Sequence, residues 1–239
     1  MKVALIGYGK MGKAIEEIIV NEGYGEVVLK IDIDNAGDLS VENLKKADVA
    51  IEFTQPTSAY HNVLTCFEAG IPVVSGTTGW LEQLEDAKKI TIEQSKGLFW
   101  ASNYSLGVNL FFEISRHLAK LMKGRAEYDV SIHEVHHTEK KDTPSGTAIT
   151  LANDILDIMD RKTKWVNDTP DSSEELAVIS YREEDVPGVH LANYESETDS
   201  IEIKHTAHSR KGFAAGAVQA AQFMVGKTGY YTMTDLLKL

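Results

Sequence analysis

The apolar residues of the first hundred positions gather into short continuous runs, and longer amphipathic stretches separate these runs. Continuous apolar runs of this length are typical of strands buried on both faces of a parallel sheet. The predicted strands are 3–6, 27–31, 48–54, 71–75 and 98–101. Apolar residues at helical spacing predict helices in 11–19, 56–70 and 81–95. Strands that alternate with helices form a doubly wound, Rossmann-like parallel sheet, so we expect an α/β fold.

The pattern changes after Asn103. The segments 108–122 and 148–159 have the spacing of amphipathic helices, and several short strand-like segments have turn residues between them. These strands are 128–135, 176–181, 189–194 and 201–206. They predict a smaller α+β domain with a mixed sheet. A last helix over 212–226 leads into a terminal segment that we expect to pack back on the first domain. The predicted domains are 1–103 with 211–239, and 104–210.

Charge and cysteine content narrow the class of protein. The net charge of −12 argues against a nucleic-acid partner, because the phosphates would be repelled. Cys66 is the only cysteine, so no intrachain disulfide can form, which favours a reducing cytoplasm. The first residues lack the pattern of a signal peptide, and no apolar run reaches membrane-spanning length. We therefore expect a cytoplasmic protein that does not contact a membrane.

A glycine-rich loop joins the first predicted strand to the first predicted helix. Its sequence is Gly7-Tyr8-Gly9-Lys10-Met11-Gly12. In this context the first glycine makes a tight turn, the second admits a pyrophosphate, and the third allows close packing of helix and strand. Asp32 ends the second predicted strand, twenty positions after Gly12, where a carboxylate would accept hydrogen bonds from ribose hydroxyls. Together these features predict a dinucleotide site.

Further cofactor contacts are expected at the carboxyl ends of the other strands, because ligands of such sheets bind along that edge. Phe53 ends the third strand, Gly76-Thr77-Thr78 follows the fourth, and Ala101-Ser102-Asn103-Tyr104 follows the fifth. The glycine-containing stretch after the fourth strand can also be read as a simple turn.

The stretch 133–147 combines proton donors, cations and a helix start. His136 and His137 can donate protons or hold an anion near neutral pH, and Lys140 and Lys141 bring positive charge. Ser145-Gly146-Thr147 precedes an apolar-periodic segment, and the N-terminus of a helix binds carboxylates or phosphates readily. The combination suits a small acid as ligand.

Each of these features alone has a simpler interpretation. A histidine pair is often structural, a lysine pair is usually solvated, and Pro-Ser-Gly-Thr is often a turn. A metal site would use His133, His136 and His137, but neither a cysteine nor a His-x3-His spacing supports one. We therefore expect no metal.

These motifs together resemble the 4-hydroxy-tetrahydrodipicolinate reductase family, also called dihydrodipicolinate reductase, over nearly the whole chain. The most specific part is the run 134–148, which is similar to the family signature E-x-H-H-x-x-K-x-D-x-P-S-G-T-A. The other matching segments are 7–12, 52–54, 76–79, 101–105, 107–109 and Arg210 with 213–217.

The resemblance implies hydride transfer from reduced nicotinamide, NADH or NADPH, to an unsaturated ring imine that bears two carboxylates. It further implies that the product is tetrahydrodipicolinate, on the route to diaminopimelate and lysine. His136 resembles the proton donor, and Lys140 resembles a second proton donor or a partner of substrate charge. His137 resembles a substrate ligand, and Ser145, Gly146 and Thr147 resemble the carboxylate cradle. The resemblance also implies a homotetramer built through the sheet of the second domain.

Two departures from the family concern the choice of cofactor. Many members carry Arg directly after the ribose-binding acid, where this chain has Ile33 and then Asp34. Lys10 stands where Arg is frequent, and a lysine cannot reproduce the bidentate grip of Arg on phosphate. These residues predict that NADH serves at least as well as NADPH. Two other functions stay open: another small nicotinamide dehydrogenase, such as one acting on an amino acid, and a dinucleotide sensor without catalysis.

Overall fold

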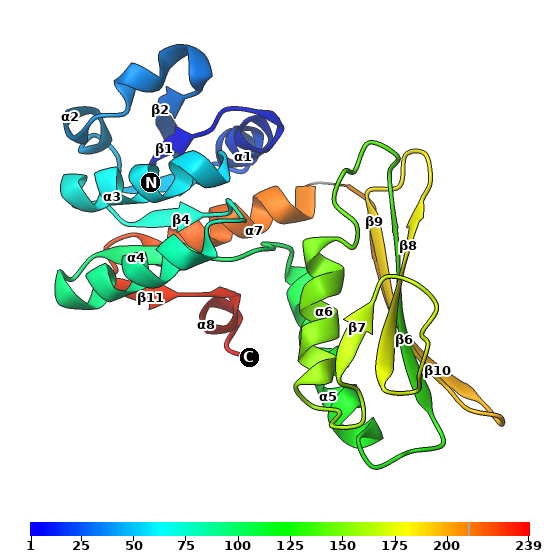
Figure 1. Ribbon diagram of the computed structural model, residues 1–239. Coiled ribbons are helices and arrows are strands. Elements are labelled where there is room, and N and C mark those ends of the chain that lie inside the picture. Colours follow the sequence, from blue (N-terminus) through cyan, green and yellow to red (C-terminus); the bar gives the residue numbers. More distant parts are fainter. Residues whose placement is uncertain (210) are drawn as a thin grey trace. The chain divides into compact units, whose positions relative to one another are not determined.

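The computed structural model describes residues 1–209 and 211–239 and divides the chain into two compact units. The first unit comprises Met1–Ser105 and Lys211–Leu239, and the second comprises Leu106–Arg210 (Figure 1). The chain therefore returns to the first unit for its last segment. Arg210, which belongs to the matching segments above, lies outside the described residues.

Within the described residues of the first unit, six strands form one parallel sheet in the order β11-β5-β4-β3-β1-β2 (Figure 1). The strands are β1 Lys2–Ile6, β2 Glu26–Ile31, β3 Val49–Glu52, β4 Val73–Ser75, β5 Gly97–Trp100 and β11 Gly229–Tyr231. The carboxyl ends of β1, β3 and β4 meet at one edge, as the sequence predicted for its glycine-rich and polar segments.

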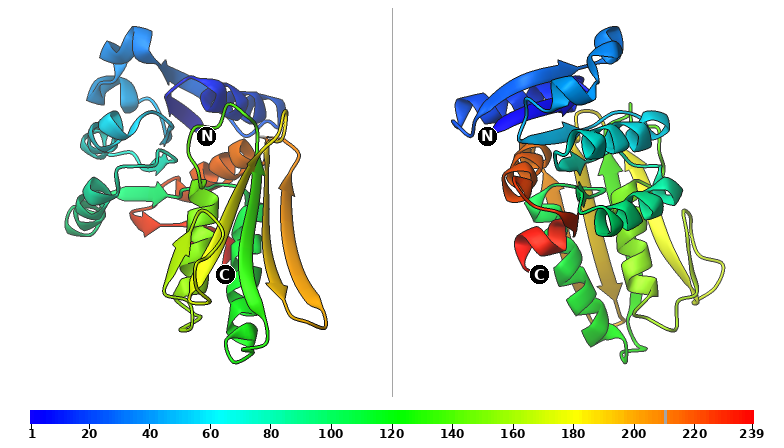
Figure 2. Two further views of the ribbon diagram at one scale, coloured as in Figure 1. Left: turned by 45° about the vertical axis from the view of Figure 1, so that its right-hand side comes forward. Right: turned by 90° about the vertical axis from the view of Figure 1, so that its left-hand side faces the viewer.

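Helices cover both faces of this sheet. Successive residues of each strand point to opposite faces, so alternate residues contact different groups of helices. Val3 and Leu5 pack with one group of helices, and Ala4 and Ile6 pack with the other. The first group is α1 Lys10–Asn21, α7 Lys211–Met224 and α8 Met233–Leu237, and the second is α2 Val41–Leu44, α3 Pro56–Ala69 and α4 Leu81–Glu93. The right-hand view of Figure 2 shows the two helical layers.

Several short elements were not predicted. They are the 3-10 helix η1 Ile33–Asp38, the one-turn helix α2, the strand β11 and the terminal helix α8. Each is at most six residues long, too short to establish a period. The strand β11 forms only because the chain returns to the first unit and pairs with β5.

The second unit contains a five-stranded mixed sheet in the order β10-β9-β6-β8-β7 among its described residues. The strands are β6 Asp129–His136, β7 Lys164–Val166, β8 Glu175–Arg182, β9 Gly188–Glu195 and β10 Ser200–Ala207. Helices α5 Leu106–Met122 and α6 Gly146–Leu156 pack on one face and close a single apolar core (Figure 2). The short strand β7 was not predicted, and α6 ends three residues before the predicted boundary.

The opposite face of this sheet carries no helix among the described residues of the unit, and side chains such as His133 and Tyr181 remain partly accessible there. The predicted fold class, a Rossmann-like parallel sheet with a smaller mixed-sheet unit, is confirmed. Among the described helices, none has the length and apolar character needed to cross a bilayer.

Candidate functional site

A row of polar side chains crosses the middle of the second unit's sheet. Glu134 and His136 lie two residues apart on β6, so both point to the side that faces the core helices. The register pairs Glu134 with Ser180 on β8 and with His190 on β9, while His136 lies opposite Arg182. The sheet itself therefore assembles one carboxylate, two imidazoles and a guanidinium.

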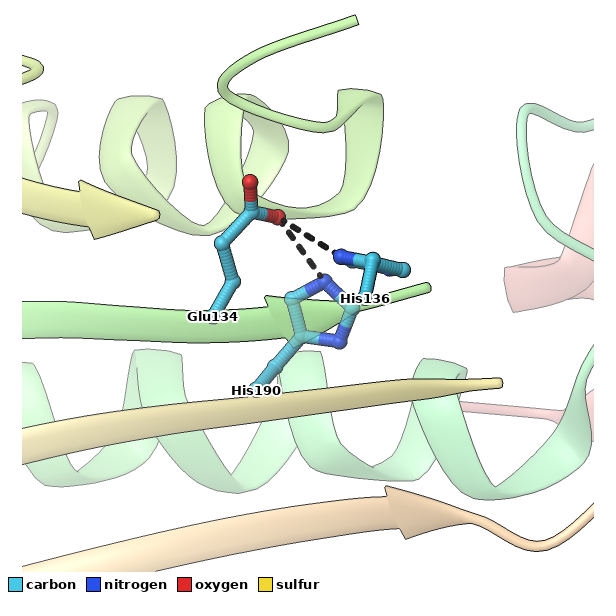
Figure 3. A group of neighbouring side chains, drawn as sticks. All are labelled: Glu134, His136 and His190. Carbon is cyan, nitrogen blue, oxygen red and sulfur yellow. Dashed lines mark ion pairs between the residues drawn. The ribbon is translucent and has the colours of Figure 1, made fainter. Parts of the chain in front are cut away.

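Glu134 is fully buried and receives hydrogen bonds from several sides. Its Oε1 accepts from the Ser145 backbone N–H at 3.0 Å and from the Ser180 hydroxyl at 2.8 Å. Its Oε2 lies 3.4 Å from His136 Nδ1 and 3.6 Å from His190 Nε2 (Figure 3). Burial alone would raise the pKa of Glu134, but the hydrogen bonds from His190, Ser145 and Ser180 outweigh it and lower this pKa to about 2. Glu134 is therefore an anion at neutral pH.

His136 is the second buried member of this group and is 7% exposed. Burial, and after it the neighbouring His190, lowers the pKa of His136 to about 4, although Glu134 opposes the change. The imidazole is therefore neutral at pH 7. A carboxylate beside Nδ1 favours the tautomer with its proton on Nδ1, which leaves Nε2 as the acceptor.

The N-terminus of α6 lies against the same carboxylate. Ser145 is the N-cap: its hydroxyl accepts from the Ala148 N–H at 3.2 Å and lies 3.1 Å from His190 Nε2. Gly146 begins the helix, is exposed, and has open space where a Cβ would stand. Thr147 follows and is half-buried. The first turn of α6 carries no acidic residue, so its positive end is available to an anion.

Two cations contact Asp142, which lies three positions before the Ser145 cap. Lys140 pairs with Asp142 at 2.8 Å, and this pairing lowers the pKa of Asp142 against the effect of burial. Arg182 donates to the Asp142 carbonyl at 2.7 Å and lies 3.8 Å from Glu134. His137 is half-buried directly after β6, and its carbonyl accepts from the Lys140 N–H at 3.1 Å. The loop after β6 therefore carries two adjacent cations, Lys140 and Lys141, flanked by the carboxylates of Glu139 and Asp142.

The glycine-rich loop of the first unit forms a cradle. Gly7 adopts a φ of 94°, and a Cβ there would stand 1.9 Å from the Phe53 carbonyl oxygen, so only glycine fits. Gly9 is the N-cap of α1, without a side-chain cap, and a Cβ on it would point into open space. A phosphate can therefore approach the backbone at the positive end of this helix. These residues fit a dinucleotide.

Two cavities lie along this loop. The first, of about 370 Å³, is lined at the loop by Gly9, Lys10, Met11 and Gly12 and opposite it by Phe53, Thr54, Gly76, Thr77 and Thr78. The second, of about 500 Å³, continues past Gly7 to Asp32, Ile33 and Ala36. Among the described residues, no lysine or arginine lines the second cavity, and the Asp32 carboxylate accepts from the Ile33 N–H at 2.9 Å.

Five predicted cofactor residues line neither of these two cavities. Tyr8 turns its hydroxyl to Glu16, and the Tyr104 hydroxyl donates to the Ser75 carbonyl at 2.7 Å. Ala101 is buried, and its N–H donates to the same carbonyl at 3.4 Å. The other two residues are Ser102, which is exposed, and Asn103, whose side-chain oxygen accepts from the Ser105 N–H at 2.9 Å. Residues 101–104 shape the segment after β5, and Tyr8 contacts Glu16 of α1.

Sequence reasoning assigned no role to Glu134, and it missed Ser180, Arg182 and His190. A usable signal exists: Glu134 follows Val130 and Ile132 at every second position of one strand. A polar residue in such a core-facing series needs polar partners. Which residues supply them depends on the strand register.

Glu134, His136 and His190 are also the one group among the described residues whose possible metal-ligating atoms lie within 4.8 Å of one another. Hydrogen bonds through Ser145 connect Glu134 with His190, and Ser180 donates to Glu134 as well. Among the described residues, Glu134 Oε2 and His136 Nδ1 have no hydrogen-bond partner. The alternative metal set from the sequence does not assemble, because His133 points to the other face of β6 and stacks on Tyr181.

Comparison with known proteins bears on both units. A family model described as dihydrodipicolinate reductase, N-terminus, matches residues 1–104, and one described as the C-terminus of the same enzyme matches residues 107–237. A 4-hydroxy-tetrahydrodipicolinate reductase from Christiangramia forsetii is 49% identical over 238 residues, covering 99% of this chain and 98% of the relative. One from Archaeoglobus fulgidus is 36% identical over the full length of both chains.

Among solved structures, the dipicolinate-bound dihydrodipicolinate reductase from Paenisporosarcina sp. TG-14 has the same fold, with a TM-score of 0.79, 23% identity and 97% of each chain covered. The family models and the relatives span both units, including the glycine-rich cradle and the Glu134–His136 row. The chain therefore belongs to the dihydrodipicolinate reductase family.

Proposed function

We propose that this protein is a 4-hydroxy-tetrahydrodipicolinate reductase, which reduces a cyclic imine dicarboxylate to tetrahydrodipicolinate on the route to diaminopimelate and lysine. One observation carries the proposal beyond family membership. A buried carboxylate–imidazole pair stands beside a helix N-terminus and a row of cations. Such a site suits a dianionic substrate that must receive a proton.

The cofactor would be a reduced nicotinamide dinucleotide, which supplies the hydride when bound. Gly7 to Gly12 would hold its pyrophosphate, and Asp32 would accept hydrogen bonds from the adenosine ribose. Phe53 and Gly76 to Thr78 would line the other half of the site. The open space at Gly9 and the uncapped first turn of α1 support this assignment.

The substrate carboxylates would bind at separate positive sites, because two like charges on one ring repel each other. One would take the first turn of α6 at Ser145, Gly146 and Thr147. The other would meet the cations of the preceding loop, including Lys140 and His137. Lys140 would release Asp142 to do so, and Asp142 is exposed enough to return to water.

His136 would donate the proton that quenches the electron density left on the ring by hydride addition. In the free protein this imidazole is neutral, since its pKa is about 4. A dianion bound next to it would stabilise the imidazolium and draw a proton onto Nε2. Glu134 would hold the ring by Nδ1 throughout and balance the new charge. His136 then becomes an acid only when a substrate is present.

We further propose that NADH serves at least as well as NADPH. A 2′-phosphate on the adenosine ribose would face the Asp32 carboxylate, with Asp34 nearby in the chain, and none of the lysines or arginines that the structure describes lines that cavity. NADP sites normally offset this with an arginine. The measurement is kcat/KM for both cofactors at fixed low salt, and an NADPH preference of roughly tenfold, or about 1.4 kcal/mol, would overturn the argument.

We also propose a cytoplasmic homotetramer that assembles through the second unit's sheet. The face of this sheet opposite α5 and α6 carries partly accessible side chains from β6, β8 and β9. A broad sheet face of this kind is stabilised when a second copy buries it.

The test of function is to follow NADH oxidation with substrate freshly generated from pyruvate and aspartate semialdehyde. We expect rapid oxidation that depends on both precursors. Oxidation with simple keto acids plus ammonia instead would identify another amino-acid dehydrogenase. Binding of NADH with no turnover on any of these compounds would indicate a dinucleotide sensor.

A further inference from the structure

Glu52 is a fully buried carboxylate at the end of β3, in the sheet of the first unit. A buried carboxylate is costly unless hydrogen-bond donors surround it. Neither the glycine-rich cradle nor the proposed chemistry uses Glu52 directly. Its surroundings show what it does.

Five hydrogen bonds converge on this carboxylate. Oε1 accepts from the Thr54 N–H at 3.1 Å, from the Thr54 hydroxyl, from the Thr77 hydroxyl at 2.9 Å, and from the Asn62 amide at 3.5 Å. Oε2 accepts from the Ser75 hydroxyl at 2.6 Å. The donors come from the last residue of β4, from the segments that follow β3 and β4, and from α3. One side chain thus joins two neighbouring strand ends.

Thr77 is fixed at more than one atom. Its hydroxyl donates to Glu52 and accepts from the Thr54 N–H at 2.8 Å. Its carbonyl oxygen accepts from two indoles, Trp80 at 2.8 Å and Trp100 at 3.0 Å. Hydrogen bonds therefore fix both the side chain and the backbone of Thr77.

The two segments joined in this way form one wall of the cavity beside the glycine-rich loop. Phe53 lies directly over Gly76, where an added Cβ would stand 2.1 Å from the Phe53 ring. A small shift of either segment would therefore change the shape of this wall. Phe53 and Thr54 also line the cavity that contains Asp32, which marks the adenosine half, whereas Gly76, Thr77 and Thr78 line only the first cavity. The segment after β4 therefore belongs to the other half, which receives the nicotinamide.

We propose that Glu52 is a positioning residue of the cofactor site: it acts through Thr77 and Thr54 to hold the segments after β3 and β4 at the spacing that the nicotinamide half requires. This inference rests on the dinucleotide part of the proposed function. A network of buried polar groups that is fully paired fixes one geometry, which an apolar core residue cannot do.

The first test is Glu52→Gln, which keeps the size of the side chain and replaces one acceptor oxygen with a donor. With the amide nitrogen at the position of Oε1, it faces the Thr54 N–H, which cannot accept; with the nitrogen at the position of Oε2, the Ser75 hydroxyl must turn to accept. Calorimetry on the full chain measures the Kd of NADH and of 5′-ADP, which lacks the nicotinamide half. We expect NADH binding to weaken roughly tenfold, comparable to the loss of one hydrogen bond, and 5′-ADP binding to change less than about twofold.

The second test uses Thr77→Val, with Thr77→Ser as the conservative variant and Thr91→Val as the matched control. Thr91 is also buried, and its hydroxyl donates to the Lys88 carbonyl in α4, outside both cavities. We expect Thr77→Val to reproduce the Glu52→Gln effect, Thr77→Ser to bind NADH more tightly than Thr77→Val because it keeps the hydroxyl, and Thr91→Val to bind NADH as the unchanged protein does. The Kd of NADH for the double variant Glu52→Gln/Thr77→Val should lie within about twofold of that for the weaker-binding single variant, because both substitutions remove the same contact.

Several results would overturn the inference. Equal weakening of NADH and 5′-ADP, additive losses in the double variant, or a lower melting temperature with normal NADH affinity would make Glu52 a general stabiliser. If Glu52→Gln does not fold, the NADH affinity, the 5′-ADP affinity and the melting temperature of the Thr77 variants test the inference instead. Failure of the unchanged protein to bind NADH at all would instead refute the cofactor assignment itself.

Discussion

Binding of a dianionic ligand should make His136 take up a proton, and the size of this effect can be worked from the structure. The pKa of His136 in the free protein is about 4, against an ordinary value of about 6.5. Restoring the ordinary value requires about 3 kcal/mol, since each pKa unit is worth about 1.36 kcal/mol. A single carboxylate placed about 5 Å away supplies roughly 3 kcal/mol at an effective dielectric constant of about 20. Two carboxylates therefore suffice to carry the pKa of His136 above 6.5.

Calorimetric titration measures this uptake. Pyridine-2,6-dicarboxylate is titrated at pH 6 into the protein saturated with NADH, in two buffers that differ in ionisation enthalpy. The difference in observed heat gives the number of protons taken up, and we expect between about half a proton and one proton per site. The variant His136→Asn should reduce the uptake to near zero. The matched control His117→Asn, at an exposed position on α5, should leave it unchanged.

Two results would refute the reasoning. Binding without proton uptake would mean that the ligand charge does not reach His136 or that Lys140 alone neutralises it. Uptake that persists in His136→Asn would assign the proton to another group.

Three further predictions concern chemistry, stability and assembly. Lys140→Ala should lower turnover by roughly 10²- to 10⁴-fold while the Kd of NADH stays unchanged, and normal turnover would remove Lys140 from the mechanism. Because the folded pKa of His136 is depressed, the unfolded chain binds a proton that the folded chain does not as pH falls from about 6.5 to about 4. The free energy of unfolding should therefore fall by up to about 3 kcal/mol over that range, and urea denaturation of His136→Asn should lack this component. A fall of the same size in His136→Asn would contradict the assignment of this pH dependence to His136. Light scattering should show a tetramer, and a stable 26.4 kDa monomer at micromolar concentration would exclude one.

The sequence by itself determined the features that depend on short-range physics. The alternation of apolar runs and helical spacing predicted the parallel sheet, because periodicity records which face of each element is buried. The glycine-rich loop and the Ser145 cap were readable because a tight turn and a helix start are decided within a few residues. These local features placed the N-termini of α1 and α6 correctly in the chain.

Only the tertiary structure decided which distant residues share the sites. His190 and Ser180 flank Glu134 because three strands pair in one register, and that register follows from packing of the whole core. Glu52 likewise gathers donors from separate segments only after β3 and β4 lie side by side. The strand β11 forms from three residues that pair with β5 after the chain returns to the first unit. Contacts between residues far apart in the chain leave no period in the sequence, because the partner strand and its register are chosen by the burial of all elements together.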